Sequence, residues 1–162
     1  MTAPDSPFVI RSDDERGVTT LTLNRPASFN ALSEGMLSAL QTELDDLARS
    51  QKLRVLVIAA SGKAFCAGHD LREMRAEPSM DYYQKLFAQC GHMMLSIQKL
   101  QVPVIAKVQG IATAAGCQLV AQCDLAVASA DAKFAVSGVN LGLFCSTPSV
   151  ALSRNLSRKA AF

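Results

Sequence analysis

The sequence of 162 residues lacks several features that would assign it to a class of protein at once. No apolar run reaches the length that crosses a membrane, because Pro103 and several polar residues interrupt the stretch 97–108. The first residues contain no basic region followed by an apolar one, so we expect neither a secretory signal nor a membrane partner. Since no internal repeat or low-complexity linker is present, we expect a single domain over 1–162.

A strong net charge is also missing. The 16 basic and 14 acidic residues leave a formal charge of +2, which is too small to imply a nucleic-acid partner. Individual Lys and Arg residues can still meet a phosphorylated small molecule. Hydrophobic residues make up 49% and charged residues 19%, a composition that is typical of compact soluble proteins and argues against disorder.

The cysteine pattern excludes two further classes. Five cysteines are an odd number, no two stand at Cys-x-x-Cys spacing, and only two histidines accompany them. We therefore expect reduced, mostly buried thiols in a cytoplasmic protein, with no disulfide framework and no metal site. The cysteines are Cys66, Cys90, Cys117, Cys123 and Cys145.

The spacing of apolar residues predicts alternating strands and helices. Strands are expected at Phe8–Arg11, Val18–Leu23, Arg54–Ala60, Val102–Val108, Asp124–Ala128 and Phe134–Val136. Helices are expected from Ser33, as N-cap, to about Arg49, from Asp70 over a short stretch, over Asp81–Leu100, over Ala114–Ala121, and from about Pro148. This order implies an α/β fold with helices covering a sheet.

Two glycine-containing loops stand between a strand and a helix. In the first, Gly68 precedes Asp70, and Glu73 follows three places later, a spacing that predicts a capping box. Such a turn can aim the N–H of His69 outward toward negative charge. The second loop, 109–113, leads into a helix that is rich in small residues. Taken alone, the first loop is explained by an ordinary capped turn, and close packing of a helix start accounts for the small residues after the second.

Three segments together resemble the signatures of the crotonase family, the enoyl-CoA hydratases and isomerases. They are Leu23-Asn24-Arg25-Pro26 with Asn30-Ala31-Leu32, then Ala64-Phe65-Cys66-Ala67-Gly68-His69-Asp70-Leu71, and finally Val108-Gln109-Gly110 with Gly116-Cys117-Gln118-Leu119 and Cys123-Asp124-Leu125. Their order and spacing fit, and the match covers essentially the whole chain. The resemblance implies a crotonase-like spiral of repeated β-β-α units that binds coenzyme A thioesters without another cofactor. It also implies a homotrimer or a dimer of trimers for a full-length member.

The resemblance further implies the parts of a site. Members of the family polarise the thioester carbonyl with two backbone N–H groups, which correspond to His69 and Ala115. An interaction of this kind stabilises a transition state by roughly 2.7–4 kcal/mol. By the same resemblance, substrate binding is expected from Arg25, Ser28, Phe29, Ala67, His69, Asp70, Leu71 and Arg72.

Two departures from the family pattern concern its chemistry. Hydratases of the family use two glutamates, and these positions correspond to Gln118 and Gly138. An amide does not exchange a proton near neutral pH, and glycine has no side chain. Because each acid–base group contributes roughly 10²–10⁴-fold, little hydration is expected. Relatives also continue beyond this chain, which resembles their N-terminal core alone.

These observations leave three functions open. The chain is either an acyl-CoA enzyme whose base lies elsewhere, with Asp70 and Glu73 as nearby candidates, or a non-catalytic acyl-CoA-binding or assembly protein. A serine hydrolase of similar spiral architecture is the third, and neither histidine has an obvious serine and acid partner for it.

Overall fold

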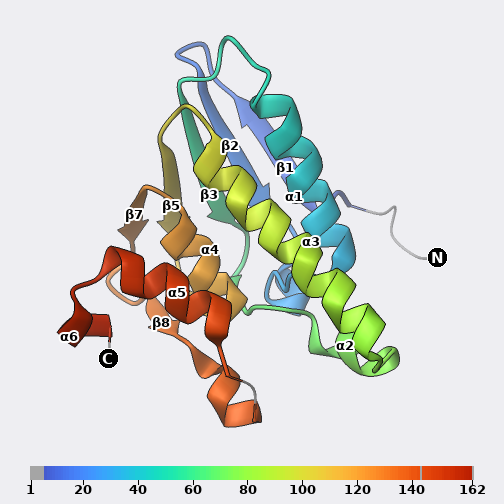
Figure 1. The fold of residues 1–162 in the computed structure, drawn as a ribbon. Coiled ribbons are helices and arrows are strands. Elements are labelled where there is room, and N and C mark those ends of the chain that lie inside the picture. Colours follow the sequence, from blue (N-terminus) through green and yellow to red (C-terminus); the bar gives the residue numbers. More distant parts are fainter. Residues whose placement is uncertain (1–5, 143, 162) are drawn as a thin grey trace.

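The computed structural model describes residues 6–142 and 144–161, and its strands form two sheets (Figure 1). The first sheet has the order β1 (Val9–Asp13), β2 (Val18–Leu23), β3 (Val55–Ala60), β5 (Val104–Val108) and β7 (Leu125–Ala128). The second has the order β4 (Ala64–Cys66), β6 (Ile111–Thr113) and β8 (Lys133–Ala135). The helices are α1 (Glu34–Leu47), α2 (Leu71–Ala76), α3 (Met80–Lys99), α4 (Ala115–Gln122), α5 (Ser146–Asn155) and α6 (Arg158–Ala161).

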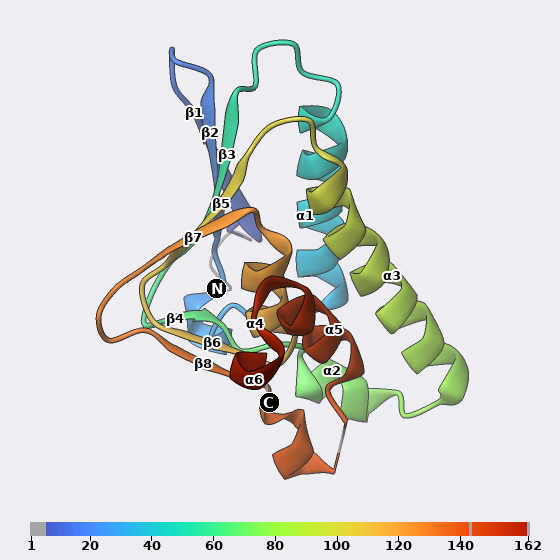
Figure 2. The same cartoon turned by 60° about the vertical axis from the view of Figure 1, so that its left-hand side comes forward.

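The chain alternates between the two sheets in a repeating way. Strands β3, β5 and β7 each lie in the first sheet, and the strand that follows each of them lies in the second. Each pair of strands is then followed by a helix, and all neighbours are parallel except β1 and β2. Figure 2 shows the first sheet nearly edge-on, with α1 and α3 on one side of it. The predicted α/β spiral of β-β-α units is confirmed.

Two strands of the second sheet were missed by the sequence analysis, which placed β4 and β6 in loops. Each spans three residues and so offers no alternating pattern that could be read from the sequence. They pair with each other in parallel, Ala64 opposite Ile111 and Cys66 opposite Ala112, with an irregularity between. The two glycine-containing loops are therefore joined by a small sheet.

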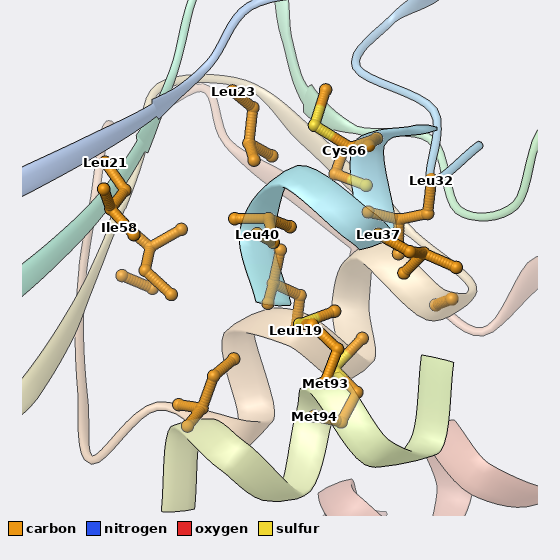
Figure 3. Packing of buried hydrophobic residues seen from close by; sticks show 14 of the residues in the cluster. Leu21, Leu23, Leu32, Leu37, Leu40, Ile58, Cys66, Met93, Met94 and Leu119 are labelled. Atoms are coloured by element: carbon orange, nitrogen blue, oxygen red, sulfur yellow. The ribbon is translucent and has the colours of Figure 1, made fainter. Parts of the chain in front are cut away.

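The core lies between the first sheet and its helices. Ser33 begins α1 as expected, its hydroxyl accepting a hydrogen bond from the N–H of Met36. The apolar stripe of α1 faces the sheet and α3, and Figure 3 shows Leu37 and Leu40 among Leu21, Ile58 and Met93. The fully buried members of the stripe are Met36, Leu37 and Leu40, and Leu44 and Leu47 are nearly so. Burying a leucine or methionine side chain contributes roughly 1.5–3 kcal/mol, so this helix is held by its stripe.

The thiols follow the expected pattern. All five cysteines are free, and four of them are buried, the half-buried one being Cys145. Burial raises the pKa of Cys66, Cys90 and Cys123 to about 12, so these groups stay protonated at neutral pH.

Of the helices in the described ranges, none combines the length and hydropathy that a membrane span needs.

Candidate functional site

The first candidate donor, the N–H of His69, lies in a turn held by the segment before α1. The N–H of Leu32 donates to the carbonyl of Gly68 at 2.7 Å, and the N–H of Ala67 donates to the carbonyl of Phe29 at 3.0 Å. Gly68 has φ 90°, a conformation that glycine adopts without strain. Within residues 6–142 and 144–161, no acceptor meets the N–H of His69. This group is therefore free to bind a ligand.

Asn30 fixes the chain that leads into this turn. Its side-chain amide is fully buried and donates to the carbonyls of Ser61 at 2.8 Å and Ala64 at 2.9 Å. Its Oδ1 accepts from the N–H of Arg25 at 2.8 Å, and its own φ is 52°, which asparagine tolerates better than most residues. The first signature segment therefore has a structural role. Through Asn30 it holds the chain that leads into β4, and through its backbone it holds the turn that follows β4.

The second candidate donor, the N–H of Ala115, begins α4. The preceding Ala114 has φ 49° and ψ −123°, an uncommon conformation for a residue with a side chain. Its N–H donates to the carbonyl of Ala135 on β8 at 2.9 Å, which holds this turn in place. The first N–H groups of a helix have no partner within the helix and carry partial positive charge. Ala115 itself is helical, so its backbone angles suit a donor.

The two donor loops are in direct contact. A Cβ placed on Gly68 would lie 3.3 Å from the backbone nitrogen of Ala115. A Cβ on Gly116 would lie only 2.1 Å from the carbonyl oxygen of Cys66, so the start of α4 approaches β4 more closely than any side chain allows. Thr113 Oγ1 also donates to the carbonyl of Ala67 at 3.1 Å. Both loops carry candidate donors in the sequence, and the structure brings them together.

The imidazole of His69 packs under the first loop. Its ring meets that of Phe87 on α3 edge-on, with centroids 5.2 Å apart. Burial lowers the pKa of His69, and a hydrogen bond with the backbone of Leu32 opposes this to a smaller extent. The ring is therefore neutral at pH 7. Its Nδ1 is buried without a hydrogen-bond partner in the described part of the chain.

The acidic residues beside the loop have structural partners. Asp70 caps α2 as expected, since its side chain accepts from the N–H of Arg72. The predicted capping box is wrong in its second half, because Glu73 Oε2 instead accepts from the N–H of Glu34 at 3.0 Å. The first turn of α1 also has free N–H groups, and it lies within reach of this side chain. Glu73 therefore joins the starts of two helices.

The remaining residues expected to bind substrate surround the first loop. Arg25 Nη1 donates to Ser33 Oγ at 3.0 Å and lies 3.8 Å from Asp70 Oδ2. Phe29 and Leu71 expose 57% and 45% of their surface, a large fraction for apolar side chains beside a polar turn. The positions that complete this group are half-buried Ser28 and exposed Ala67 and Arg72.

The two positions at which the family resemblance places the glutamates of hydratases have different surroundings. Gln118 is buried on α4, one turn after Ala115, and its Oε1 has no hydrogen-bond partner among residues 6–142 and 144–161. Gly138 lies in the 3₁₀ helix Ser137–Leu141 that follows β8, and its N–H donates to Cys145 Sγ at 3.1 Å. Its φ is outside the left-handed range in which other glycines of this chain fall.

Several residues that shape the site escaped the sequence analysis. Asn30 was noted only as part of a signature, and the contact of Phe87 on α3 with the ring of His69 was not expected. Ala114 carries no sign of its unusual backbone angles, since a residue with a side chain is uncommon at a φ of 49°. Long-range contacts of this kind leave no local periodicity in the sequence. No cluster of three or more potential metal-ligating side chains is found in the described ranges.

Comparison with known proteins gives close relatives. The chain is 51% identical over 147 residues to enoyl-CoA hydratase domain-containing protein 3, mitochondrial, of Xenopus laevis, covering 91% of this chain and 50% of that protein. It matches a crystal structure of an enoyl-CoA hydratase from Mycobacterium smegmatis with a TM-score of 0.95 and 69% identity, over 97% of this chain and 61% of that one. A crystal structure of human enoyl-CoA hydratase domain-containing protein 3 matches with a TM-score of 0.89 and 47% identity, over 95% of this chain and 60% of that one.

These relatives correct the expected cellular location and show how much of a full-length relative the chain covers. Proteins of the same name in rat and human, like that of Xenopus laevis, are called mitochondrial, so the expected cytoplasmic location is wrong. That expectation rested on reduced thiols, which exclude only oxidising compartments. The chain spans about half the length of the curated relatives it matches.

A match over nearly the whole sequence assigns the chain to a family. The sequence model of the enoyl-CoA hydratase/isomerase family matches residues 13–162. This range contains both donor loops and the two positions Gln118 and Gly138. The chain therefore belongs to the enoyl-CoA hydratase/isomerase family, the crotonases.

Proposed function

We propose that this protein binds a coenzyme A thioester and polarises its carbonyl between the backbone N–H groups of His69 and Ala115. The observation that carries the proposal is the contact between the two donor loops at Gly68 and Ala115. The N–H of His69 has no acceptor among the described residues, and that of Ala115 lies at a helix start. Two preorganised donors on touching segments are the arrangement that stabilises a developing oxyanion.

The coenzyme A portion is expected at the first loop. Arg72 is exposed at the second position of α2, so it can contribute positive charge toward phosphate groups, whereas the charge of Arg25 is partly offset by Asp70, 3.8 Å away. The exposed rings and alkyl groups of Phe29 and Leu71 offer an apolar surface next to these charges. Phosphates and an aromatic base are the parts of coenzyme A that such a surface suits.

Hydration is not part of the proposal. Gln118 cannot act as a general acid or base near neutral pH, and Gly138 has no side chain. The nearby carboxylates are engaged, Asp70 as the cap of α2 and Glu73 as acceptor from the N–H of Glu34. This engagement favours a second candidate, a protein that binds acyl-CoA without turning it over.

Removal of one donor tests the proposed binding. Ala115→Pro deletes the N–H at the first position of α4, a position that suits proline, but the preceding Ala114, at φ 49° and ψ −123°, is not in the extended conformation that a residue before proline prefers. Calorimetry should show about tenfold weaker binding of butyryl-CoA and little change for free coenzyme A, because only the thioester carbonyl loses a hydrogen bond. Met80→Pro, at the first position of α3, is the matched control and should bind butyryl-CoA as the parent does.

Equal affinity of the Ala115→Pro and parent proteins for butyryl-CoA would contradict the assignment of this donor. Circular dichroism of both variants checks that they fold. Turnover of a panel of acyl-CoA thioesters separates the two candidates: any product formation supports an enzyme, and uniform inactivity in a protein that binds the panel supports the non-catalytic candidate.

The homotrimer or dimer of trimers implied by the family stays a prediction. Leu125 and Val127 on β7 and Phe134 on β8 expose between 47% and 65% of their surface, and these strands end their respective sheets. Exposed apolar residues at sheet edges support an assembly that covers them. Light scattering of the purified protein measures its mass in solution and tests this expectation.

A further inference from the structure

The direction of the first donor is set by the peptide group between Gly68 and His69. The carbonyl of this group accepts from the N–H of Leu32 at 2.7 Å, and the carbonyl and N–H of a planar trans peptide point in opposite directions. Leu32 and His69 form an isolated parallel bridge that belongs to neither of the two sheets. The N–H of His69 therefore keeps its direction only as firmly as this bridge is held.

Arg25 joins the two sides of the bridge. Its Nη1 donates to Oγ of Ser33, the residue that follows Leu32, at 3.0 Å. The same Nη1 lies 3.8 Å from Oδ2 of Asp70, the residue that follows His69, at a distance of ionic attraction without a direct hydrogen bond. One guanidinium thus contacts the chain at equivalent positions on both sides of the bridge.

The burial of Asp70 gives this contact its importance. The side chain is only 12% exposed, and a carboxylate in such surroundings is unfavourable unless charge and hydrogen bonds compensate it. Its Oδ1 accepts from the N–H of Arg72, and Arg25 is its one ionic partner in the part of the chain that the structure describes. The positive charge of Arg25 therefore already has a partner within the protein.

The guanidinium of Arg25 is itself held in place. The N–H of Arg25 donates to Oδ1 of Asn30 at 2.8 Å, and its carbonyl accepts from the N–H of Asn30 at 3.0 Å. The guanidinium lies over the ring of Phe8, 5.2 Å from its centroid, which is a cation–π distance. A Cβ on Gly35 would lie 2.7 Å from Cζ of Phe8, so the glycine in the first turn of α1 makes room for this ring. Arg25 is thus preorganised by both its backbone and its side chain.

We infer that Arg25 is a positioning residue for the first oxyanion donor, because it holds Ser33 and Asp70 on the two sides of the bridge that aims the N–H of His69. This inference rests on the proposed binding of coenzyme A thioesters, and it gives Arg25 a role other than the direct substrate contact that the family resemblance implies. A contact with the phosphates would change the affinity for every form of coenzyme A. Positioning of the donor affects only a ligand that carries a thioester carbonyl.

Substitution of Arg25 separates the two roles. In calorimetric titrations, Arg25→Met should bind butyryl-CoA about tenfold more weakly than the parent and free coenzyme A within about twofold of it, since both polar contacts are lost and an apolar stem remains. Arg72→Met is the contrasting control. Arg72 is expected at the phosphates, so its removal should weaken binding of both ligands by a similar factor.

Asp70→Asn tests the ionic half of the arrangement. Asparagine is as good an N-cap as aspartate, so the start of α2 is kept. Butyryl-CoA should bind about threefold more weakly, which is the effect of one modest ion pair, and free coenzyme A should bind as it does to the parent. If Arg25 instead reached the phosphates, removal of the opposing carboxylate would strengthen the binding of both ligands.

The carbonyl of the ligand reports the direction of the donor. Butyryl-CoA labelled with ¹³C at the carbonyl should show a lower infrared stretching frequency when it is bound to the parent than when it is free, because hydrogen bonds polarise the bond. At saturating protein the shift should be smaller in Arg25→Met. Partial unfolding would reduce the amount of bound ligand and leave its frequency unchanged, so this measurement separates positioning from loss of fold.

The outcomes distinguish this inference from the function on which it rests. Three results overturn the inference and leave thioester binding intact: equal effects of Arg25→Met on the two ligands, tighter binding of free coenzyme A by Asp70→Asn, or an unchanged carbonyl shift in a folded Arg25→Met protein. Failure of the parent to bind butyryl-CoA contradicts the proposed function and the inference together. Thermal melts confirm that each variant is folded at the temperature of the titrations.

Discussion

The candidate donor loops and the positions Gln118 and Gly138, where hydratase glutamates are expected, differ in what holds them. Around His69 and Ala115, backbone hydrogen bonds, the buried amide of Asn30 and the close approach of Gly116 fix the chain. At Gln118 the side chain is buried but unsatisfied, and at Gly138 there is no side chain to hold. The backbone part of the site is thus built into the fold, and the side-chain part is separable from it.

Under the proposed function, this difference would allow a family member to keep its scaffold while its chemistry changes. A donor formed by main-chain N–H groups depends on strand pairing and helix starts, which are hard to alter without unfolding. A glutamate depends on one side chain and can be replaced by a residue that fits the space. Two kinds of substitution test this difference. One restores the carboxylate side chains, and the other disturbs the backbone of the donor loops.

The largest effect is expected from restoring both carboxylates. Gln118→Glu with Gly138→Glu should raise crotonyl-CoA hydration at least about 100-fold over the parent, because each acid–base group contributes roughly 10²–10⁴-fold. Each single variant should gain much less, since water activation and proton delivery need both groups. The backbone conformation at Gly138 does not itself oppose a side chain, as its φ is outside the left-handed range. The initial rate of loss of crotonyl-CoA absorbance measures the gain.

Burial of the new carboxylate at 118 favours its neutral form and lowers stability, so folding is checked alongside rate. A folded double variant that binds crotonyl-CoA and hydrates it no faster than the parent would contradict the view that the two side chains set the activity. The matched control is Gln98→Glu, which adds a carboxylate elsewhere on the wall of the cavity that α3, α4 and α5 form beside Gln118, and it should give no hydration.

Disturbing the backbone of the second loop should affect folding directly. In Gly116→Ala the added Cβ would lie 2.1 Å from the carbonyl oxygen of Cys66, so the start of α4 must move away from β4. We expect a loss of about 3 kcal/mol in the free energy of unfolding, together with loss of acyl-CoA binding. Urea denaturation measures the stability.

Gly91→Ala is the control for this change, because its Cβ meets nothing within 4 Å. It should stabilise the protein by roughly 0.5–1 kcal/mol, since alanine is the better helix residue. Equal effects of the two substitutions would contradict the close approach of the loops.

A smaller loss in the free energy of unfolding is expected when Asn30, the side chain that anchors the first loop, is shortened. Asn30→Ala leaves the carbonyls of Ser61 and Ala64 without their donor and places alanine at a φ of 52°. The expected loss is about 2 kcal/mol, since unpaired buried groups are costly. Asn155→Ala removes a similar pair of hydrogen bonds from an exposed side chain and should cost less than about 1 kcal/mol. A larger loss for Asn155→Ala in urea denaturation would contradict this ranking.

The sequence predicted the part of the molecule in which local pattern and tertiary structure agree. The stripe of α1, the cap at Ser33 and the strand at Val18–Leu23 follow directly from residue spacing. The strands β4 and β6 are too short for a pattern, and Glu73 was assigned to its own helix because its real partner, Glu34, is 39 residues away. The cavity beside Gln118 is formed by three helices and could not be read from any one of them.

The smallest effect concerns the imidazole beside the first donor. Burial lowers the pKa of His69 in the folded protein below its ordinary value of 6.5. As the pH falls through 6.5, the unfolded chain takes up this proton first, so folding loses stability between 6.5 and the lower pKa of the folded state. His69→Gln keeps the backbone N–H and removes the titrating group, so the variant should lose less stability between pH 7.5 and pH 5.5 than the parent. Urea denaturation at both pH values measures the difference, with His92→Gln, on the exposed side of α3, as the control that should behave like the parent. Parallel losses in His69→Gln and parent would mean that the ring titrates alike in the folded and unfolded states, against its packing on Phe87.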